Sequence, residues 1–399
     1  MYKHNIENAK EHFARILEIE LDRIKQMKTE TDFVNFEALP KIVIGVVGGD
    51  GIGPFIAAQT QKILESLLQN EIETGKVEFR IVDGLTIENR IAAMQSIPEN
   101  VLTQLKQCNV ILKGPTTTPD ISSGMPNLES ANVSMRREFD LFANIRPVKV
   151  RELGIDWTFF RENTEGEYIL GSQGINVTED LAIDFKSTTT PGAARIIRAA
   201  FEYAKNNGKK RVTIITKANV IKTTDGKFLN IAKEIAKEYP GIICDDWYID
   251  IMTAKLIDDS RRSQFEVMVM PNLYGDILTD EAAQIQGGVG TAGSANIGTK
   301  YAMFEAIHGS APRMVAEGRA KYADPSSMIK AGVMMLEHIG FPKKAAKLQM
   351  ALEICSQYER KVKLTGRSDG ATNDEYTAYI LETVYDPNLT TKYDEYTNG

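Results

Sequence analysis

Two acidic residues in one short stretch offer the clearest chemistry in this sequence. The stretch Pro271 to Gly298 follows the apolar run FEVMVM and ends in a loop of glycines and small residues. Within it, ILTDEAAQIQ predicts a helix, and Asp276 and Asp280, four residues apart, would project from one face of that helix. Two such carboxylates could share one cation, whereas either alone could simply be a residue that suits the first turn of a helix.

Several arginines precede this stretch. Arg136 and Arg146 lie ten residues apart in SANVSMRREFDLFANIRPVK, and Arg161 follows in FRENTEGEY. A single arginine on a helix is usually solvated. Several arginines near strand ends, accompanied by Ser130 and Asn132, instead suggest bidentate recognition of a substrate with several carboxylates.

Three more residues have both a structural and a catalytic interpretation. Tyr168 is either a core aromatic or a reactive phenol. Lys217 ends the strand-like run RVTIIT, and a lysine buried at a strand end is uncommon and shifts its pKa easily, which favours a catalytic role. Asp250 stands at an expected helix start, where capping is the ordinary alternative.

Two loops that follow apolar runs are candidates for ligand binding. GGDGIGP, from Gly48 to Pro54, differs from the G-x-G-x-x-G fingerprint and is either a tight turn or a loop near a ligand. KGPTTTPD, from Lys113 to Asp120, places three threonines at the carboxyl end of an expected parallel strand. Ligand crevices of α/β proteins form there, although a polar strand exit is the alternative.

Composition limits the classes of partner and of metal site. The net charge of −7 and the isoelectric point near 5.4 argue against binding to nucleic acid or to an acidic membrane. The three cysteines lack a C-x-x-C spacing, and no two of the four histidines have the spacing of zinc ligands. Any metal would therefore be held by oxygen ligands, which points to Mg²⁺ or Mn²⁺.

No segment predicts secretion or a membrane span. The start of the sequence, MYKHNIENAKEHF, lacks the apolar core of a signal peptide, and no apolar run has the length of a membrane-spanning helix. We therefore expect a cytoplasmic protein.

Alternating apolar runs and helical periods must position these residues. Helices are expected at about 55–68, 91–107, 193–206 and 226–239, and buried strands at KIVIGVV, VEFRIV, NVILKG, WTFFREN, RVTIIT and FEVMVM. This order predicts an α/β protein with mainly parallel strands. Before it lies an amphipathic helix whose apolar stripe must be buried on its own domain or on a partner; the stripe consists of Phe13, Ile16, Leu17, Leu21, Ile24 and Met27.

From about Lys41 to the C-terminus, these motifs resemble those of the isocitrate/3-isopropylmalate dehydrogenase family, the β-decarboxylating dehydrogenases. NLYGDILTDEAAQIQGGVGTAGSANIG is similar to the long signature of the family, and KGPTTTP, MRREFDLFANIRPVK, FRENTEGEY, TKANVIKTTDG and FEAIHGSAP match in the same order. Ser130-x-Asn132-x-x-Met135-Arg136 is similar to the S-x-N-x-x-L-R pattern of isocitrate dehydrogenases, whereas isopropylmalate enzymes have apolar residues there. A third substrate carboxylate needs hydrogen-bond donors, which favours isocitrate.

The resemblance implies a two-domain α/β fold with a mixed, mainly parallel sheet that is not a standard Rossmann domain. Residues 41–141 and 287–399 would form a large domain on the cofactor side. Residues 142–286 would form a small domain with substrate and metal residues, including a dimer clasp near 166–190. Residues 1–40 would be an N-terminal helical extension.

The resemblance also implies roles for individual residues. Tyr168 would be the catalytic acid and Lys217 part of the base network. The substrate would be held by Thr118, Ser130, Asn132, Arg136, Arg146 and Arg161. The cofactor would contact Thr117, Asn219, His308, Gly309, Ser310, Ala311, Pro312, Arg313 and Asp324. Mg²⁺ or Mn²⁺ would be bound by Asp250, Asp276 and Asp280. In a homodimer, Lys217 and Asp250 would be contributed across the interface.

The reaction implied is the oxidative decarboxylation of isocitrate to 2-oxoglutarate and CO₂, a step of the tricarboxylic acid cycle, with hydride transfer to NAD or NADP. The alternatives are a sibling enzyme acting on homoisocitrate or 3-isopropylmalate, a non-catalytic regulatory subunit, and an interaction role for the N-terminal helix. Arg313 could pair with the 2′-phosphate of NADP, but Met314 could not. VKLTGRSDGAT also has no Tyr and Arg at the places where bacterial NADP enzymes make further contacts with the phosphate, so NAD is favoured.

Overall fold

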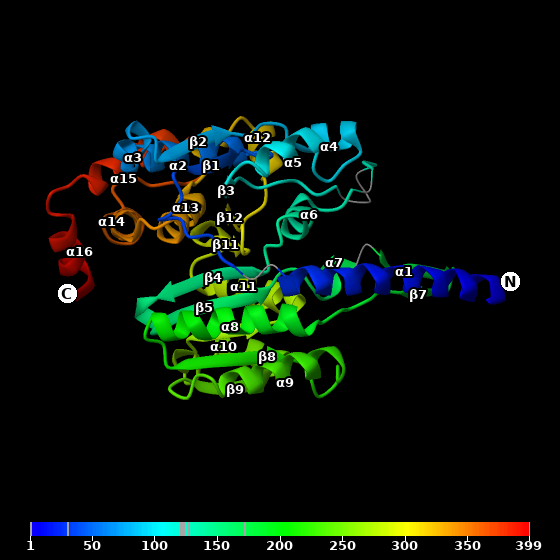
Figure 1. The fold of residues 1–399 in the computed structure, drawn as a ribbon. Helices are drawn as coiled ribbons and strands as arrows, with labels where there is room; N and C mark the ends of the chain where they lie inside the picture. Colours follow the sequence, from blue (N-terminus) through cyan, green and yellow to red (C-terminus); the bar gives the residue numbers. More distant parts are fainter. Residues whose placement is uncertain (1, 30–31, 120–123, 127, 171–172, 399) are drawn as a thin grey trace. The chain divides into compact units, whose positions relative to one another are not determined.

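The computed structural model describes residues 2–29, 32–119, 124–126, 128–170 and 173–398 (Figure 1). The contacts between residues divide the chain into two compact units. The first unit comprises residues 1–33, 136–286 and 296–299, and the second comprises residues 34–135, 287–295 and 300–399. The N-terminal segment thus belongs to the same unit as Asp276 and Asp280.

The first unit contains five neighbouring strands in the order β4-β5-β10-β8-β9. Their bounds are β4 Ala143–Val150, β5 Ile155–Glu162, β8 Arg211–Thr216, β9 Ile243–Tyr248 and β10 Val267–Met270. β5, β10, β8 and β9 pair in parallel, and β4 pairs antiparallel with β5. The strands expected from WTFFREN, RVTIIT and FEVMVM are confirmed. The sequence pattern does not predict β4 and β9, because charged or polar residues interrupt their apolar positions.

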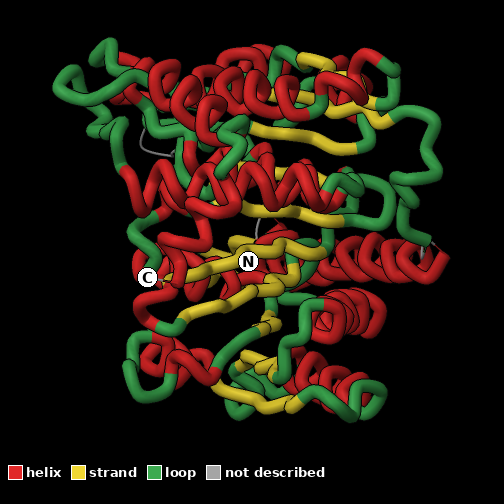
Figure 2. The backbone as a smooth tube through the Cα atoms, turned by 90° about the vertical axis from the view of Figure 1, so that its left-hand side faces the viewer, coloured by secondary structure: helices red, strands yellow, loops and turns green. Residues whose placement is uncertain are grey.

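Helices cover both faces of these strands (Figure 2). The helices on one face are α8 (Thr190–Asn206) and α9 (Thr224–Ala236), and those on the other face are α10 (Ile249–Leu256) and α11 (Asn272–Ile285). Ile214 of β8 packs in the core under α8 and α9, while its neighbour Ile215 packs in the core under α10 and α11. Successive side chains of a strand point to opposite faces, so burial on both sides explains the continuous apolar runs.

A long N-terminal helix and a small hairpin complete the first unit. The helix α1 (Tyr2–Thr29) runs beside the hairpin of β6 (Ile175–Thr178) and β7 (Leu181–Ile183), as Figure 1 shows. Asn5 Nδ2 donates a hydrogen bond to the Val177 carbonyl at 2.8 Å. The hairpin lies within the segment expected to form a dimer clasp, of which residues 171–172 are outside the described part of the chain.

The apolar stripe expected along α1 is only partly buried in this chain. Ile16 and Met27 are buried, and Phe13 stacks on Phe185 with 5.4 Å between ring centroids. Leu17 and Leu21 remain 45% and 57% exposed. Charged side chains of α1 occupy part of the buried face instead.

The second unit contains four parallel strands in the order β2-β1-β3-β12. These are β1 (Ile42–Val47), β2 (Val77–Ile81), β3 (Val110–Lys113) and β12 (Ala302–Ala306). The next strand in the order, β11 (Gly293–Ile297), begins in the second unit and ends in the first. The family fold expected from the sequence, α/β with a mixed and mainly parallel sheet, is confirmed.

Helices surround the strands of the second unit (Figure 1). They are α2 (Gly53–Leu67), α3 (Gln69–Glu73), α4 (Ile87–Ala93), α5 (Glu99–Leu105), α6 (Ala131–Glu138), α12 (Pro312–Ala316), α13 (Ser326–His338), α14 (Pro342–Glu353), α15 (Asn373–Val384) and α16 (Leu389–Asn398); the last residues of α6 belong to the first unit. The single helix expected at about 91–107 is wrong. Met94 has a positive φ and ends α4, and Pro98 directly precedes α5.

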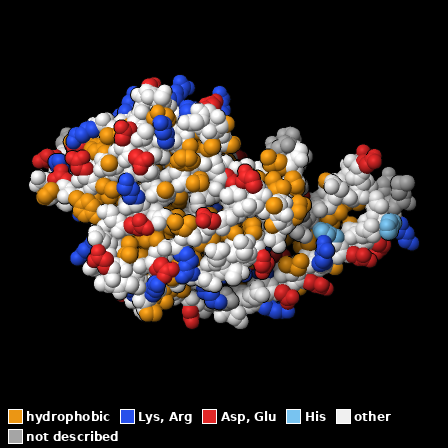
Figure 3. Space-filling view, turned by 90° about the horizontal axis from the view of Figure 1, so that it is seen from above, with side chains coloured by type: hydrophobic (Ala, Val, Ile, Leu, Met, Phe, Trp, Pro, Cys, Tyr) orange, Lys and Arg blue, Asp and Glu red, His pale blue; other side chains and the backbone are white. Residues whose placement is uncertain are grey.

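On the face drawn in Figure 3, acidic and basic side chains are interspersed. Within the described part of the chain, no helix is both long enough and apolar enough to cross a membrane.

Candidate active site

Asp276 is the centre of a polar cluster in the first unit. α11 begins directly after β10 and its flanking proline, so Asp276 lies near the carboxyl end of a parallel strand. One carboxylate oxygen of Asp276 accepts a hydrogen bond from Arg161 Nη1, and the other accepts one from the Tyr168 hydroxyl at 2.5 Å. The Arg161 guanidinium also lies 5.1 Å from the centroid of the Tyr168 ring. Residues from two separate motifs, Arg161 and Tyr168 of FRENTEGEY and Asp276 of the stretch from Pro271 to Gly298, therefore meet at one point.

The protonation states in this cluster follow from its charges. Burial alone would raise the pKa of Asp276, but the charge of Arg161 and the hydrogen bond from Tyr168 outweigh burial and lower it. Burial and the hydrogen bond to Asp276 raise the pKa of Tyr168 to about 12. At neutral pH, Asp276 is thus a carboxylate and Tyr168 is a neutral phenol that can donate a proton.

Two further arginines extend the cluster along α11. Arg146 Nη1, on β4, donates to Thr279 Oγ1 at 2.6 Å and lies 3.3 Å from Asp280 Oδ1. Arg136, at the end of α6, is buried, and its charge also lowers the pKa of Asp276. The side chain of Asp280 is 65% exposed, whereas those of Arg146 and Arg161 are almost fully buried. Buried cations beside exposed carboxylates suit an anionic ligand that arrives together with a metal cation.

Lys217 and Asp250 form a second polar pair in the first unit. Lys217 follows β8, Asp250 lies in the first turn of α10, and Lys217 Nζ is 2.5 Å from Asp250 Oδ1. The hydrogen bond from Lys217 lowers the pKa of Asp250. The N-cap position of α10 is Tyr248, so the capping role considered for Asp250 is wrong.

The residues expected at the cofactor lie in the second unit, except Asn219, which is exposed in the first. The hydroxyls of Thr117 and Ser310 are 2.7 Å apart, so the two cofactor loops meet. The loop that contains Gly48 to Pro54 supports both of them: Asp50 N donates to Pro115 O, and Ile52 N donates to Ser310 O. GGDGIGP is therefore a turn that packs against these loops.

The conformation of this turn depends on glycine. Gly49 and Gly51 have φ values of +73° and +59°, a region that favours glycine. A Cβ at Gly51 would collide with the carbonyl of Ser310. The Asp50 carboxylate accepts hydrogen bonds from Thr117 N at 2.6 Å and from Ile87 N at 2.8 Å, which fixes the start of the threonine loop.

The other predicted residues of the second unit lie around these loops. Asn132 Oδ1 accepts a hydrogen bond from the Thr116 hydroxyl at 3.2 Å, and the Ser130 carbonyl accepts one from Ser134 N. Thr118 is exposed, and Asp120 lies outside the described residues.

The second cofactor loop ends at the start of a short helix. His308 Nδ1 is 3.0 Å from Gly309 O, and Ala311, which precedes Pro312, has a φ of 45°. Arg313 Nε donates to Glu317 at 2.6 Å and is highly exposed. Asp324 accepts from Ser326 N at 2.8 Å.

Comparison with known proteins assigns this arrangement to a family. Residues 43–366 match the family model described as isocitrate/isopropylmalate dehydrogenase. The chain belongs to the isocitrate/isopropylmalate dehydrogenase family. The match of the family model begins at β1, so residues 1–42 of this family member, including α1, lie outside it.

The relatives of this family member carry both coenzyme types in their names. A probable isocitrate dehydrogenase (NAD) subunit alpha, mitochondrial, of Caenorhabditis elegans is 36% identical over 317 residues, which are 77% of this chain and 83% of that protein. An isocitrate dehydrogenase (NADP) of Rickettsia prowazekii is 40% identical over 306 residues, 74% of this chain but only 59% of the longer relative. The crystal structure of isocitrate dehydrogenase from Methylococcus capsulatus has a TM-score of 0.75 and 33% identity, and the match covers 86% of this chain and all of that one.

A divalent cation would fit the carboxylates of α11. Among the described residues, no group of three or more His, Cys, Asp or Glu side chains is placed to hold a metal ion. Asp276 and Asp280 are nevertheless one helical turn apart, partly exposed and supplied with oxygen donors, which Mg²⁺ and Mn²⁺ prefer. The carboxylate oxygens of Asp276 and Asp280 therefore fit such an ion. Further ligands would have to come from outside these two residues.

Sequence reasoning misses the residues that orient the predicted ones. Asn272 Oδ1 accepts hydrogen bonds from Arg161 Nε at 2.9 Å and Nη2 at 2.7 Å, so its side chain fixes the plane of the guanidinium. The buried Asp225 accepts from the backbone N of Lys217 at 2.7 Å. Arg90, buried in the second unit, donates to Thr117 O at 2.7 Å. For Asn272 a signal exists, since it follows the apolar run at the strand exit; for the others the contact is visible only in the fold.

Proposed function

We propose that this chain catalyses the metal-dependent oxidative decarboxylation of isocitrate to 2-oxoglutarate and CO₂, with hydride transfer to NAD or NADP. The observation that carries the proposal is the double hydrogen bonding of Asp276 by Arg161 and Tyr168. These hydrogen bonds bring together a carboxylate that could bind a metal ion, an arginine that could bind an anion and a protonated phenol that could act as an acid. The names of the relatives support isocitrate as the substrate.

Substrate binding would rest on the buried arginines. Arg161, Arg146 and Arg136 would hold the carboxylates of isocitrate, because a guanidinium offers paired donors and stays charged when buried. Ser130, Asn132 and Thr118 of the second unit would supply neutral donors for the remaining carboxylate. An apolar substituent such as an isopropyl group would leave these polar groups without partners, which disfavours 3-isopropylmalate.

Asp276 and Asp280, with Asp250, would hold Mg²⁺ or Mn²⁺. A divalent cation supplies Lewis-acid chemistry: it lowers the pKa of the substrate hydroxyl and stabilises negative charge on the enolate. A base network that includes Lys217 would take the hydroxyl proton as hydride leaves for the nicotinamide. Tyr168, whose pKa is raised to about 12, would protonate the carbon after CO₂ is lost.

We further propose a homodimer whose active sites are shared. In a single chain, Asp250 pairs with Lys217, and the described residues contain no group of three potential metal-binding side chains. A second subunit that contributes both residues would complete the set, with the hairpin of β6 and β7 in the clasp. The second unit would then be the cofactor side of each subunit.

NAD is the proposed coenzyme, with NADP as the alternative. Arg313 is 87% exposed and pairs with Glu317, whose carboxylate would have to release it before it could bind a 2′-phosphate. Met314 offers no such contact. These residues support NAD, although the named relatives include enzymes of both types.

A kinetic comparison tests this proposal. The purified chain is assayed with Mg²⁺ and each coenzyme on isocitrate, homoisocitrate and 3-isopropylmalate. We expect the highest kcat/KM for isocitrate with NAD. An equal or higher kcat/KM for another acid would identify that acid as the substrate instead of isocitrate. Absence of turnover on all three acids at saturating Mg²⁺ would favour a regulatory subunit.

A further inference from the structure

A buried ion network joins the N-terminal helix α1 to the active-site unit. Arg23 Nη2 donates to Glu165 Oε1 at 3.0 Å, and Arg23 also makes two hydrogen bonds to Glu20, at 3.1 and 2.9 Å. The side chain of Glu165 is 3% exposed and that of Arg23 is 18% exposed. Burial lowers the pKa of Arg23, but the hydrogen bonds and charges of Glu20 and Glu165 outweigh burial and raise it, so Arg23 stays cationic.

Glu165 depends on this cation. Its carboxylate accepts hydrogen bonds from Thr189 N, at 2.9 Å, and from the Thr189 hydroxyl, and it lies so close to Gly192 that a Cβ there would collide with it. A second buried carboxylate, Glu162, is nearby: burial raises the pKa of Glu162, and the charge of Glu165 raises it further. Glu162 is the last residue of β5, and Glu165 lies in the loop that follows. Arg23 supplies positive charge to Glu165 from α1, while the charge of Arg195 lowers the pKa of Glu162.

The same loop orients the arginine assigned to the substrate. The main-chain carbonyl of Glu165 accepts a hydrogen bond from Asn272 Nδ2 at 3.2 Å. The Oδ1 atom of Asn272 accepts the two hydrogen bonds from Arg161 that fix its guanidinium plane. Arg161 in turn contacts Asp276. A continuous series of contacts thus runs from Arg23 through Glu165 and Asn272 to Arg161.

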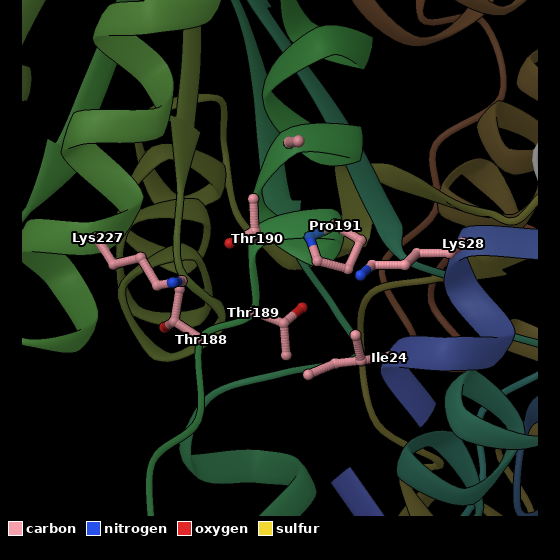
Figure 4. Close-up of a pocket in the computed structure, with 8 residues that line it drawn as sticks. Ile24, Lys28, Thr188, Thr189, Thr190, Pro191 and Lys227 are labelled. Atoms are coloured by element: carbon pink, nitrogen blue, oxygen red, sulfur yellow. The ribbon is translucent and has the colours of Figure 1, made fainter. Parts of the chain in front are cut away.

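A pocket also lies beside α1 at this point. This pocket of about 480 Å³ separates the end of α1 from the start of α8; it is lined by Ile24, Lys28, Thr188, Thr189, Thr190, Pro191, Ala194 and Lys227. Figure 4 shows Ile24 and Lys28 on one side of this space and Thr188 to Pro191 on the other. The ion pair of Arg23 and Glu165 is a direct link between α1 and the loop.

We infer that Arg23 is a positioning residue for Arg161, and that the N-terminal helix therefore sets the affinity of the enzyme for its substrate. The inference rests on the proposed function, since it takes Arg161 to bind a substrate carboxylate. Loss of Arg23 leaves Glu165 as an uncompensated buried charge, and the loop must move to solvate it. Asn272 and Arg161 move with the loop, so substrate binding weakens, while Tyr168 and Lys217 keep their chemistry.

The test compares Arg23→Gln with Lys25→Gln in the full-length chain. Lys25 lies on the same helix, is 77% exposed and pairs with Asp22. For Arg23→Gln we expect the KM for isocitrate to rise about tenfold or more, with kcat and the KM for the coenzyme within about threefold of wild type. Lys25→Gln should match wild type. A purely structural role would lower the amount of active enzyme, and so kcat, without raising the KM for isocitrate.

Rescue variants keep the test decisive if Arg23→Gln folds poorly. Arg23→Lys retains the charge and should restore most of the affinity. The double variant Arg23→Gln with Glu165→Gln removes both charges and should have a lower KM than Arg23→Gln alone. An unchanged KM in Arg23→Gln, or failure of both rescues, overturns the inference.

Failure of the proposed function would look different. Wild-type protein that never oxidises isocitrate would refute the activity, and crystal structures of wild type and Arg23→Gln would then test the inference without substrate. We expect the hydrogen bond between Asn272 and Glu165 to be broken and Arg161 to be displaced in the variant. An identical position of Arg161 in both structures would refute the positioning role.

Discussion

Asp276 accepts hydrogen bonds from a buried arginine and from a phenol, so its charge is fixed in position before a cation binds. The same contacts keep Tyr168 protonated, because ionisation of the phenol beside a carboxylate would place two negative charges together. In the proposed mechanism, Asp276 would therefore both bind the metal ion and keep the acid Tyr168 protonated. Substituting the metal-binding residues and the acid one at a time should therefore separate their effects on activity.

Replacing Tyr168 with Phe should remove the proton donor while leaving the binding residues in place. We expect kcat for isocitrate to fall about 10²- to 10⁴-fold, the usual contribution of a general acid, with little change in KM. Steady-state kinetics at saturating Mg²⁺ measure both constants. Turnover that stays near the wild-type value would exclude Tyr168 as the acid.

Replacing Asp280 with Asn should weaken the metal site. The carboxamide keeps the size of the side chain but loses a charge, so we expect the Mg²⁺ concentration for half-maximal activity to rise about tenfold or more. Asp259→Asn is the control, because Asp259 is exposed and pairs with Arg262 outside the proposed site. Wild-type activity of Asp280→Asn at limiting Mg²⁺ would refute the metal assignment.

For individual residues, the sequence predicts the side chains that could do chemistry better than it predicts the side chains that orient them. Asp276, Arg161 and Tyr168 stand in motifs whose composition indicates chemistry. The residues that orient them, Asn272 and Glu165, act through contacts between segments more than 100 residues apart. Such contacts arise from strand order and helix packing, and no local pattern encodes them.

Among the elements, buried parallel strands are the most predictable, since burial on both faces selects continuous apolar runs. β4 alternates polar and apolar residues, and β9 is only partly buried, so neither has this pattern. The sequence predicts that α1 is a helix, but it does not predict which part of the protein α1 packs against. Its stripe indicates one apolar face, whereas the fold buries Glu20 beside Ile16 and leaves Leu21 exposed.

The end of α13 carries a pH-sensitive residue. Burial lowers the pKa of His338 to about 4, and its ring packs 5.1 Å from Phe36 and 5.5 Å from Phe304. The unfolded chain has the ordinary value of about 6.5 and so binds the proton more tightly. Stability should therefore fall as the pH drops below about 6.5, and the loss should be complete near pH 4.

His338→Gln tests this effect of pH. Between pH 7 and pH 5 the wild type should lose on the order of 2 kcal/mol of unfolding free energy through this residue. The variant should be less stable at pH 7 but should lose less on acidification, because glutamine does not titrate. Guanidinium unfolding curves at both pH values measure the difference. Equal losses in both proteins would show that His338 does not control acid stability.

For the whole molecule, the proposed sharing of the active site between two subunits makes a prediction about mixed dimers. Tyr168→Phe and Lys217→Met should each be inactive as homodimers. If Lys217 acts across the interface, a mixed dimer contains one site with both native residues, so coexpression should recover about a quarter of wild-type activity. Sedimentation should show a dimer throughout. No recovery in dimers proven to be mixed would indicate that each chain uses its own Lys217.

The division of the chain into two units also bears on the role proposed for the N-terminal helix. The family model begins at residue 43, yet residues 1–33 belong to the unit that carries Asp276. Because Arg23 lies in this segment, we expect the affinity for the substrate to depend on residues that the family motifs do not cover.

The central claim is that this chain oxidises isocitrate at the cluster of Arg161, Tyr168 and Asp276. It is tested most directly by incubating the purified chain with isocitrate, Mg²⁺ and NAD or NADP, and measuring reduced coenzyme, 2-oxoglutarate and CO₂. We predict equal amounts of the three products, none of which forms when EDTA removes the metal. Absence of 2-oxoglutarate with either coenzyme, or its formation without a metal ion, would contradict the account.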